Sequence, residues 1–105
     1  MKIYVDLNVE RFILSLDKST AAKVLRTVDL LEEFGNRLGM PHSKKVALAI
    51  FELRIRGKHE IRIFYTFYKS RAHLLHGFIK KSQKTPQKEL HTAITKFKNL
   101  THYNL

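Results

Sequence analysis

The sequence contains no cysteine, only two prolines and four glycines, and less than half as many acidic as basic residues. Without cysteine the chain can form neither a disulfide framework nor a thiolate zinc site. The start, MKIYVDLNVERF, has no apolar run long enough for a signal peptide or a membrane span. We therefore expect a soluble, cytoplasmic protein that does not associate with membranes.

Clustered metal ligands are also absent from the sequence. The nine carboxylates are scattered without a DxD or ExK pattern, and the six histidines lack HxH or HxxxH spacing. These are the spacings at which side chains usually converge on a metal ion. We therefore expect no metal site and no cofactor.

Positive charge is concentrated in the second part of the chain. Six basic and six acidic residues lie between Met1 and Ser43, so this segment has no net charge. From Lys44 onward there are fourteen basic residues against Glu52, Glu60 and Glu89, which accounts for the whole net charge of +11. Such an asymmetry is typical of a surface that binds a polyanion, most often a nucleic acid.

The length of 105 residues and the hydrophobic share of 44% favour a single domain, residues 1–105, with one core. Apolar spacing and turn residues predict the order β-α-α-β-β-β-α. The fold class is α+β, with helices packed on a mostly antiparallel sheet. The expected elements are a strand at 3–5, a helix capped by Asn8, a helix from Asp17 or Ser19 to Gly35, strands at 47–56, 60–68 and 72–79, and a helix that starts at Thr85-Pro86.

The segment FELRIRGKHEIRIFY predicts a hairpin with two different faces. Placing both aliphatic rows on one core pairs Leu53 with Ile63 and Arg54 with Arg62. A shifted register stays open, because Gly57 is not at the loop position that a bulged turn prefers. Two arginines that face each other repel unless an anion or a carboxylate lies between them. Glu52 and Glu60 are the nearby carboxylates, and we favour an RNA phosphate.

The third strand extends this charged face. In the same register Phe64 pairs with His76 and Arg62 with Phe78, while Tyr68 pairs with Ala72 and Glu60 with Lys80. We expect Phe64 and Phe78 to offer apolar surface to bases, and His76, beside Phe64, to be an RNA-binding residue that could serve as an acid or base. The expected phosphate-binding residues on this face and in the loop that follows it are Arg54, Arg56, Arg62, Lys80, Lys81 and Lys84.

A site with many cations and no metal can cleave RNA through the 2′-hydroxyl group of the RNA itself. Arginine and lysine stabilise the charge that develops on the phosphorane, and an in-line geometry is required. The same charge would also suit a domain that binds RNA or ribosomes without catalysis.

The segments FELRIRGKHEIRIFY and LLHGFIKKSQKTPQKEL together resemble the RelE/ParE superfamily of toxins from toxin–antitoxin systems, in its HigB-like, phage-related branch. The resemblance extends over nearly the whole chain, and the triplet Glu52-Leu53-Arg54 belongs to it. It implies a toxin that cleaves mRNA in translating ribosomes. The implied partners are mRNA, the ribosome and a cognate antitoxin, typically a helix-turn-helix protein through which DNA is bound only indirectly.

The resemblance also implies roles for individual residues. Arg54, Arg62 and Lys80 would contact the scissile phosphate as catalytic residues, and only Tyr103 could match a tyrosine that some relatives use near the C-terminus. The superfamily also contains gyrase inhibitors of the ParE type, so fold alone does not decide the activity.

Overall fold

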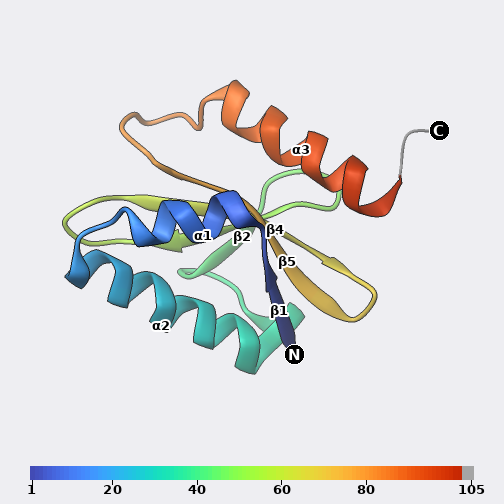
Figure 1. Ribbon diagram of the computed structural model, residues 1–105, viewed down its shortest axis with the longest axis horizontal. Helices are drawn as coiled ribbons and strands as arrows, with labels where there is room; N and C mark the ends of the chain where they lie inside the picture. Colours follow the sequence, from blue (N-terminus) through green and yellow to red (C-terminus); the bar gives the residue numbers. More distant parts are fainter. Residues whose placement is uncertain (103–105) are drawn as a thin grey trace.

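The computed structural model describes residues 1–102 and confirms an α+β fold of five strands and three α-helices. Figure 1 shows α3 above the sheet and α2 below it. The elements are β1 (Lys2–Val5), α1 (Leu7–Leu14), α2 (Lys18–Phe34), a short 3-10 helix (Gly35–Arg37), β2 (Ser43–Lys45), β3 (Phe51–Ile55), β4 (Ile61–Tyr68), β5 (Arg71–Ile79) and α3 (Gln87–Thr101). None of the helices within residues 1–102 has the length and apolar character needed to cross a membrane.

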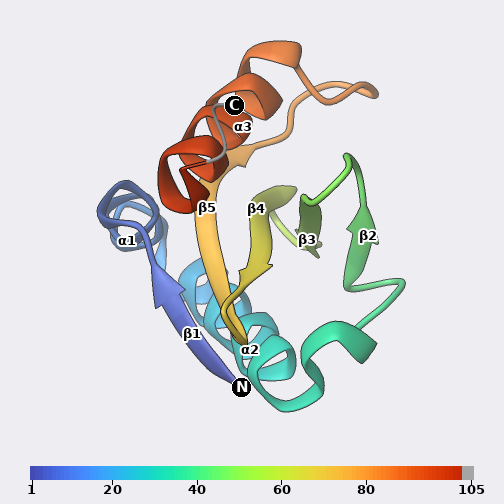
Figure 2. The same cartoon turned by 90° about the vertical axis from the view of Figure 1, so that its right-hand side faces the viewer.

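The sheet has the strand order β1-β5-β4-β3-β2, and Figure 2 shows the strands side by side in this order. The expected meander of β3, β4 and β5 is confirmed. The sequence did not predict β2 or the parallel pairing of β1 with β5. The strand expected at 47–56 begins only at Phe51, because Val46 and Ile50 close a turn through a backbone hydrogen bond of 3.0 Å.

The register of the hairpin is confirmed. Leu53 pairs with Ile63 and Arg54 with Arg62, so the shifted register is excluded. Between β4 and β5 the expected pairing holds from Arg62 to Phe64, after which a bulge shifts it by one residue. Tyr68 therefore pairs with Arg71, and the expected pair of Tyr68 with Ala72 is wrong.

The sheet separates two clusters of buried side chains. One face packs against α1 and α2 through the aliphatic row that contains Leu53, Ile63 and Tyr65. The other face packs against α3 through a cluster in which Phe64, Leu75 and Phe78 meet Ala93. The remainder of this second face, at the end of the β3–β4 hairpin, carries the arginines.

Helix ends follow local capping chemistry. Asp17 caps α2, as expected, and Gly35 ends it at a positive φ of 55° that a glycine adopts without strain. Asp6, and not Asn8, caps α1 by accepting a hydrogen bond from the backbone N–H of Asn8 at 2.9 Å. At α3 Pro86 takes the N-cap position expected for Thr85. The Thr85 hydroxyl instead donates to Glu52 Oε2 at 3.4 Å.

Candidate phosphate-binding cleft

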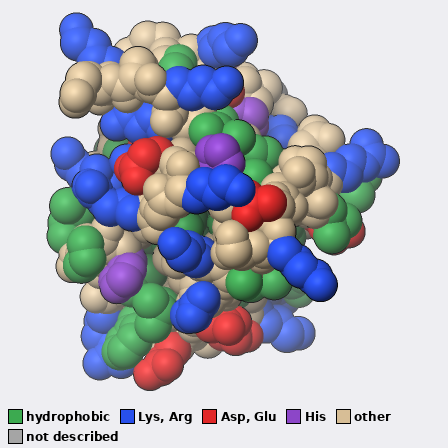
Figure 3. All heavy atoms as spheres, turned by 90° about the vertical axis from the view of Figure 1, so that its left-hand side faces the viewer, with side chains coloured by type: hydrophobic (Ala, Val, Ile, Leu, Met, Phe, Trp, Pro, Cys, Tyr) green, Lys and Arg blue, Asp and Glu red, His purple; other side chains and the backbone are tan. Residues whose placement is uncertain are grey.

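A cleft of about 470 Å³ lies between the β3–β4 hairpin and the segment that follows β5. We call it the basic cleft. Figure 3 views the molecule from this end and shows many Lys and Arg side chains around it, with fewer carboxylates among them. Its lining residues are Arg54, Arg56, Glu60, Arg62, Lys80, Lys81, Ser82 and Gln83. Five predicted cations of the sequence therefore do come together.

Arg62 forms the floor of the basic cleft and is only 2% exposed. Its NH2 group donates to Glu60 Oε1 at 3.3 Å, and NH1 donates to the backbone oxygen of Ile61 at 3.2 Å. A buried guanidinium with these bonds is held in one orientation, which is what recognition of a phosphate requires. Arg62 is therefore held in place by Glu60 and the Ile61 backbone.

Glu52 explains why two arginines face each other across the ladder. Its Oε1 atom lies 3.5 Å from Arg62 Nε and 3.8 Å from Arg54 Nε, and the residue is 4% exposed. Both Nε groups are at ion-pair distance without hydrogen-bond geometry. The carboxylate reduces the repulsion between the two arginines. An RNA phosphate is thus not needed to explain the pairing, which corrects the interpretation favoured from the sequence.

The cleft keeps a positive balance despite its carboxylates. Five cations line it, while Glu60 lines it and Glu52 lies beneath, so the net charge is +3. Arg56 and Lys81 are exposed. The backbone N–H of Lys80 donates a hydrogen bond of 2.7 Å to the backbone oxygen of Glu60, which fixes the Lys80 backbone. Lys84 is exposed but does not line the cleft. An anion entering from solvent would meet Arg56, Lys80 and Lys81 first.

The prediction that Phe64 and Phe78 offer apolar surface to bases is wrong. Phe64 is 0% and Phe78 5% exposed, and the two rings pack against each other with centroids 5.5 Å apart beneath α3. Strand alternation correctly places them on the face that carries the arginines. It does not reveal that a helix covers that part of the face.

His76 pairs with Phe64, as expected, and stacks on Phe78, but it does not line the basic cleft. Its Nε2 atom is 2.7 Å from Glu89 Oε1 on α3, and the two side chains are equally half-buried. The contact joins β5 to α3. In this arrangement His76 has a structural partner and no access to an anion in the cleft.

Tyr65 belongs to the core, since its side chain is 1% exposed and shares a hydrogen bond with the Ser43 hydroxyl. Burial raises the pKa of the Tyr65 phenol, and the bond to Ser43 lowers it in part. Tyr103 lies outside the described residues. Among residues 1–102 there is no group of three or more histidine or carboxylate side chains that could hold a metal ion.

Sequence reasoning missed the polar side chains that line or support the cleft without being basic. Ser82 and Gln83 belong to its wall, and Glu60 is its one partly exposed carboxylate, with a side-chain exposure of 38%. From the sequence alone, Glu60 is expected only as a carboxylate that could neutralise the arginines. Its predicted pairing with Lys80, where the segment after the third strand begins, is the signal that marks Glu60 as part of the site.

A comparison with protein-family models finds a match to one family, described as phage-derived protein Gp49-like (DUF891), over residues 11–98. The matched region contains the hairpin, the segment after β5 and nearly all of α3. A comparison with curated proteins finds no match.

Proposed function

The chain belongs to the family of phage-derived Gp49-like proteins, which is associated with toxin–antitoxin toxins of the RelE and HigB type, and from this premise we propose that it is a toxin that cleaves mRNA in translating ribosomes. The observation that carries the proposal is the basic cleft, where one buried and four more accessible cations surround a single partly exposed carboxylate. Because translation takes place in the cytoplasm, we propose that the protein acts there.

The chemistry is attack by the 2′-hydroxyl oxygen on the adjacent phosphorus. The new O2′–P bond forms as the P–O5′ bond breaks, leaving a 2′,3′-cyclic phosphate and a 5′-hydroxyl end. Arg54, Arg62 and Lys80 stabilise the added charge on the phosphoryl oxygens. Glu60 accepts the 2′-hydroxyl proton, and Lys81 donates a proton to the departing O5′. No step requires a metal.

The proposed partners follow from the family and from the charge. An antitoxin neutralises the toxin, and we propose a helix-turn-helix protein that brings the pair to DNA. It acts either by covering the basic cleft or by preventing entry into the ribosome. Ribosomal RNA and mRNA supply the polyanion that the +11 charge attracts.

The test is a reconstituted translation reaction on a defined mRNA, with 5′ ends mapped by primer extension, with and without ribosomes. Lys80→Ala should slow cleavage by about 100-fold, the effect of losing a donor that touches the transition state, and Arg56→Ala should slow it through weaker binding of RNA. Both residues are at least partly exposed, so their loss leaves the buried pair of Glu52 and Arg62 intact. Lys88→Ala, on the exposed surface of α3, is the matched control and should cleave like the unmodified protein.

Intact mRNA in the presence of ribosomes would overturn the proposal. Ribosome binding without cleavage would then identify a non-catalytic RNA-binding domain. One observation favours that second function. Glu52 and Glu60 already form ion pairs with Arg62 and neutralise part of its charge. Trapping of gyrase on cleaved DNA in a parallel assay would instead identify a gyrase inhibitor.

A further inference from the structure

A second hollow, of about 330 Å³, lies on the other side of Arg54 and Arg56. We call it the edge pocket. It is formed between α2, which contributes Lys23 and Arg26, and the residues around His42 that precede β2. The basic cleft and the edge pocket share Arg54 and Arg56, so these two arginines form the boundary between them.

The edge pocket exists because β2 is short. It pairs with β3 only from Phe51 to Leu53, and the last contact along this edge is the backbone hydrogen bond from Arg54 N–H to the His42 oxygen at 2.8 Å. Beyond this point no strand within residues 1–102 covers the outer edge of β3. Arg56 is therefore exposed at an open sheet edge that faces α2.

The residues that line the edge pocket carry positive charges and include no negative charge to compensate them. Lys23, Arg26, Arg54 and Arg56 are cationic, His42 adds a titratable ring, and no carboxylate is among the lining residues. The Lys23 side chain extends over the β3–β4 loop, since a Cβ atom at Gly57 would lie 2.6 Å from Lys23 Nζ. Glu52 pairs with Arg54 from behind the pocket, at 3.8 Å, so the compensation is only partial, and a bound anion would stabilise the remaining cations.

We propose that the edge pocket binds a backbone phosphate of the same single-stranded RNA whose neighbouring phosphate occupies the basic cleft. The inference rests on the proposed function, because it takes RNA as the occupant of the cleft. A strand that crosses the Arg54–Arg56 boundary passes from one cluster of cations to the next. Successive phosphates along RNA provide charges at the regular intervals that two adjoining sites require. Lys23 and Arg26 thus extend the contact with RNA without touching the reacting atoms.

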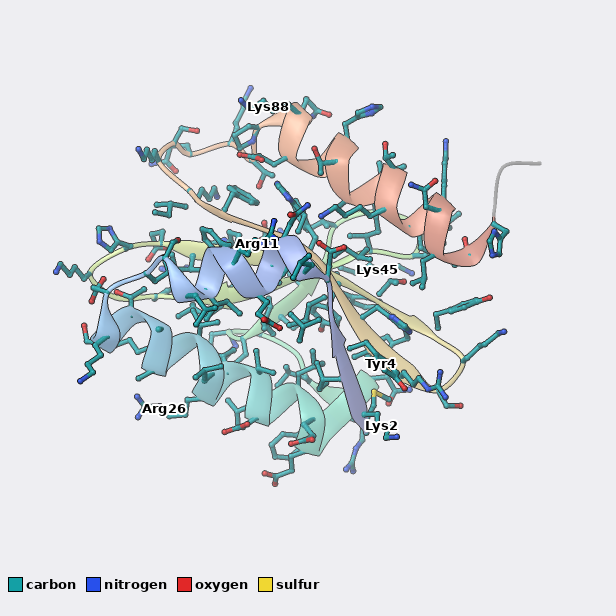
Figure 4. All side chains as sticks on the ribbon, in the orientation of Figure 1. Lys2, Tyr4, Arg11, Arg26, Lys45 and Lys88 are labelled. Carbon is teal, nitrogen blue, oxygen red and sulfur yellow. The ribbon has the colours of Figure 1, made fainter. Side chains whose placement is uncertain are left out.

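The experiment measures affinity for 2′-O-methyl RNA oligonucleotides of three to nine nucleotides by fluorescence anisotropy at several salt concentrations. The 2′-O-methyl group prevents cleavage, so binding is scored apart from catalysis. The test variant is Lys23→Ala/Arg26→Ala. The control, Lys2→Ala/Arg11→Ala, removes the same charges from exposed positions on β1 and α1. Figure 4 shows Arg26 on α2 apart from both control positions.

For the longer oligonucleotides, Lys23→Ala/Arg26→Ala should weaken binding by about 100-fold, since each of the two lost contacts with a charged group is worth about tenfold. The slope of log affinity against log salt should fall by roughly 1.4, the value for two lost contacts with a single strand. The shortest oligonucleotide and the control variant should show neither change.

Equal affinity of the test and control variants at every length, or no RNA binding by the unmodified protein, would overturn the inference. If the double variant binds RNA normally but loses affinity for polyglutamate, the edge pocket docks an acidic protein segment, and the RNA proposal is wrong. Failure of the proposed function has a separate signature. Oligonucleotide binding would then depend on Lys23 and Arg26 while mRNA in translating ribosomes stayed intact.

Discussion

At the scale of single residues, Glu52 sets how much positive charge the basic cleft presents. It is buried between Arg54 and Arg62, and breaking a buried ion pair from one side usually costs about 3 kcal/mol of folding free energy. Glu52→Gln should therefore lower the free energy of unfolding in urea by about that amount while it raises affinity for RNA. Glu10→Gln, an exposed change on α1, should alter neither quantity. Unchanged stability and unchanged affinity in Glu52→Gln would show that the carboxylate does not compensate the arginines.

Glu60 carries the second prediction at this scale. Glu60→Gln keeps an oxygen that can accept the bond from Arg62 but removes the capacity to take a proton at neutral pH. Loss of a general base slows reactions by roughly 100-fold to 10,000-fold. Cleavage in the translation assay should slow by at least the lower value, with RNA affinity preserved. Undiminished cleavage would assign the proton transfer to another group.

At the scale of elements, α2 depends on its N-cap and carries Lys23 and Arg26 to the edge pocket. The hydroxyl groups of Thr20 and Ser19 donate hydrogen bonds to Asp17 and hold the pKa of that carboxyl well below its usual value of 3.8. A carboxyl whose pKa is lower in the folded than in the unfolded state stabilises the fold above the unfolded value. This contribution is lost as the pH falls below it.

Asp17→Asn tests this contribution, because asparagine caps helices well and does not titrate. The stability advantage of the unmodified protein over Asp17→Asn should be largest at pH above about 5 and should shrink as the pH falls toward about 2. Urea unfolding at a series of pH values measures the difference. A difference that stays constant with pH would show that the titration of Asp17 does not change the stability of the fold.

At the scale of the whole molecule, the net charge of +11 acts against the folded state. Charges on the surface repel over about 10 Å at 0.1 M salt and over only about 3 Å at 1 M. Thermal unfolding should therefore shift to higher temperature when sodium chloride is raised from about 0.05 M to about 0.5 M. Circular dichroism on heating provides the measurement. A lower melting temperature at high salt would mean that the ion pairs stabilise the fold more than the excess charge destabilises it.

Much of the element order and one key pairing could be predicted because they depend on local periodicity. Alternation fixed which side of each strand is apolar, and the opposition of Arg54 and Arg62 followed from it. The sequence did not predict β2, because Ser43-Lys44-Lys45 has no alternation of apolar and polar residues. This segment becomes a strand only through its pairing with β3. The pairing of Tyr68 failed because a bulge near Leu74 and Tyr65 leaves no clear signal in composition.

The sequence predicted the cations of the candidate site but not which neighbouring residues are covered and which stay open to solvent. Arg62 and Phe64 are two residues apart in β4 and so share one face, yet α3 covers one region of that face and leaves the other open. The position of α3 depends on the path of the chain after Lys80 and on the packing of its Ala93 against Phe64 and Phe78 of the sheet. A pattern with a period of two residues contains no information about that path.

The sequence by itself determined the α+β class, the apolar and polar faces of the hairpin strands and the concentration of positive charge after Ser43, and it favoured the observed hairpin register. These properties depend on residues close together in the chain or on composition alone. Only the tertiary structure decided that Glu52 lies between the arginines, that Phe64 and Phe78 are buried, and that Lys23 joins Arg54 and Arg56 at an open sheet edge. These arrangements depend on how distant elements pack, because packing decides which charged side chains share a surface and which polar groups must find a partner.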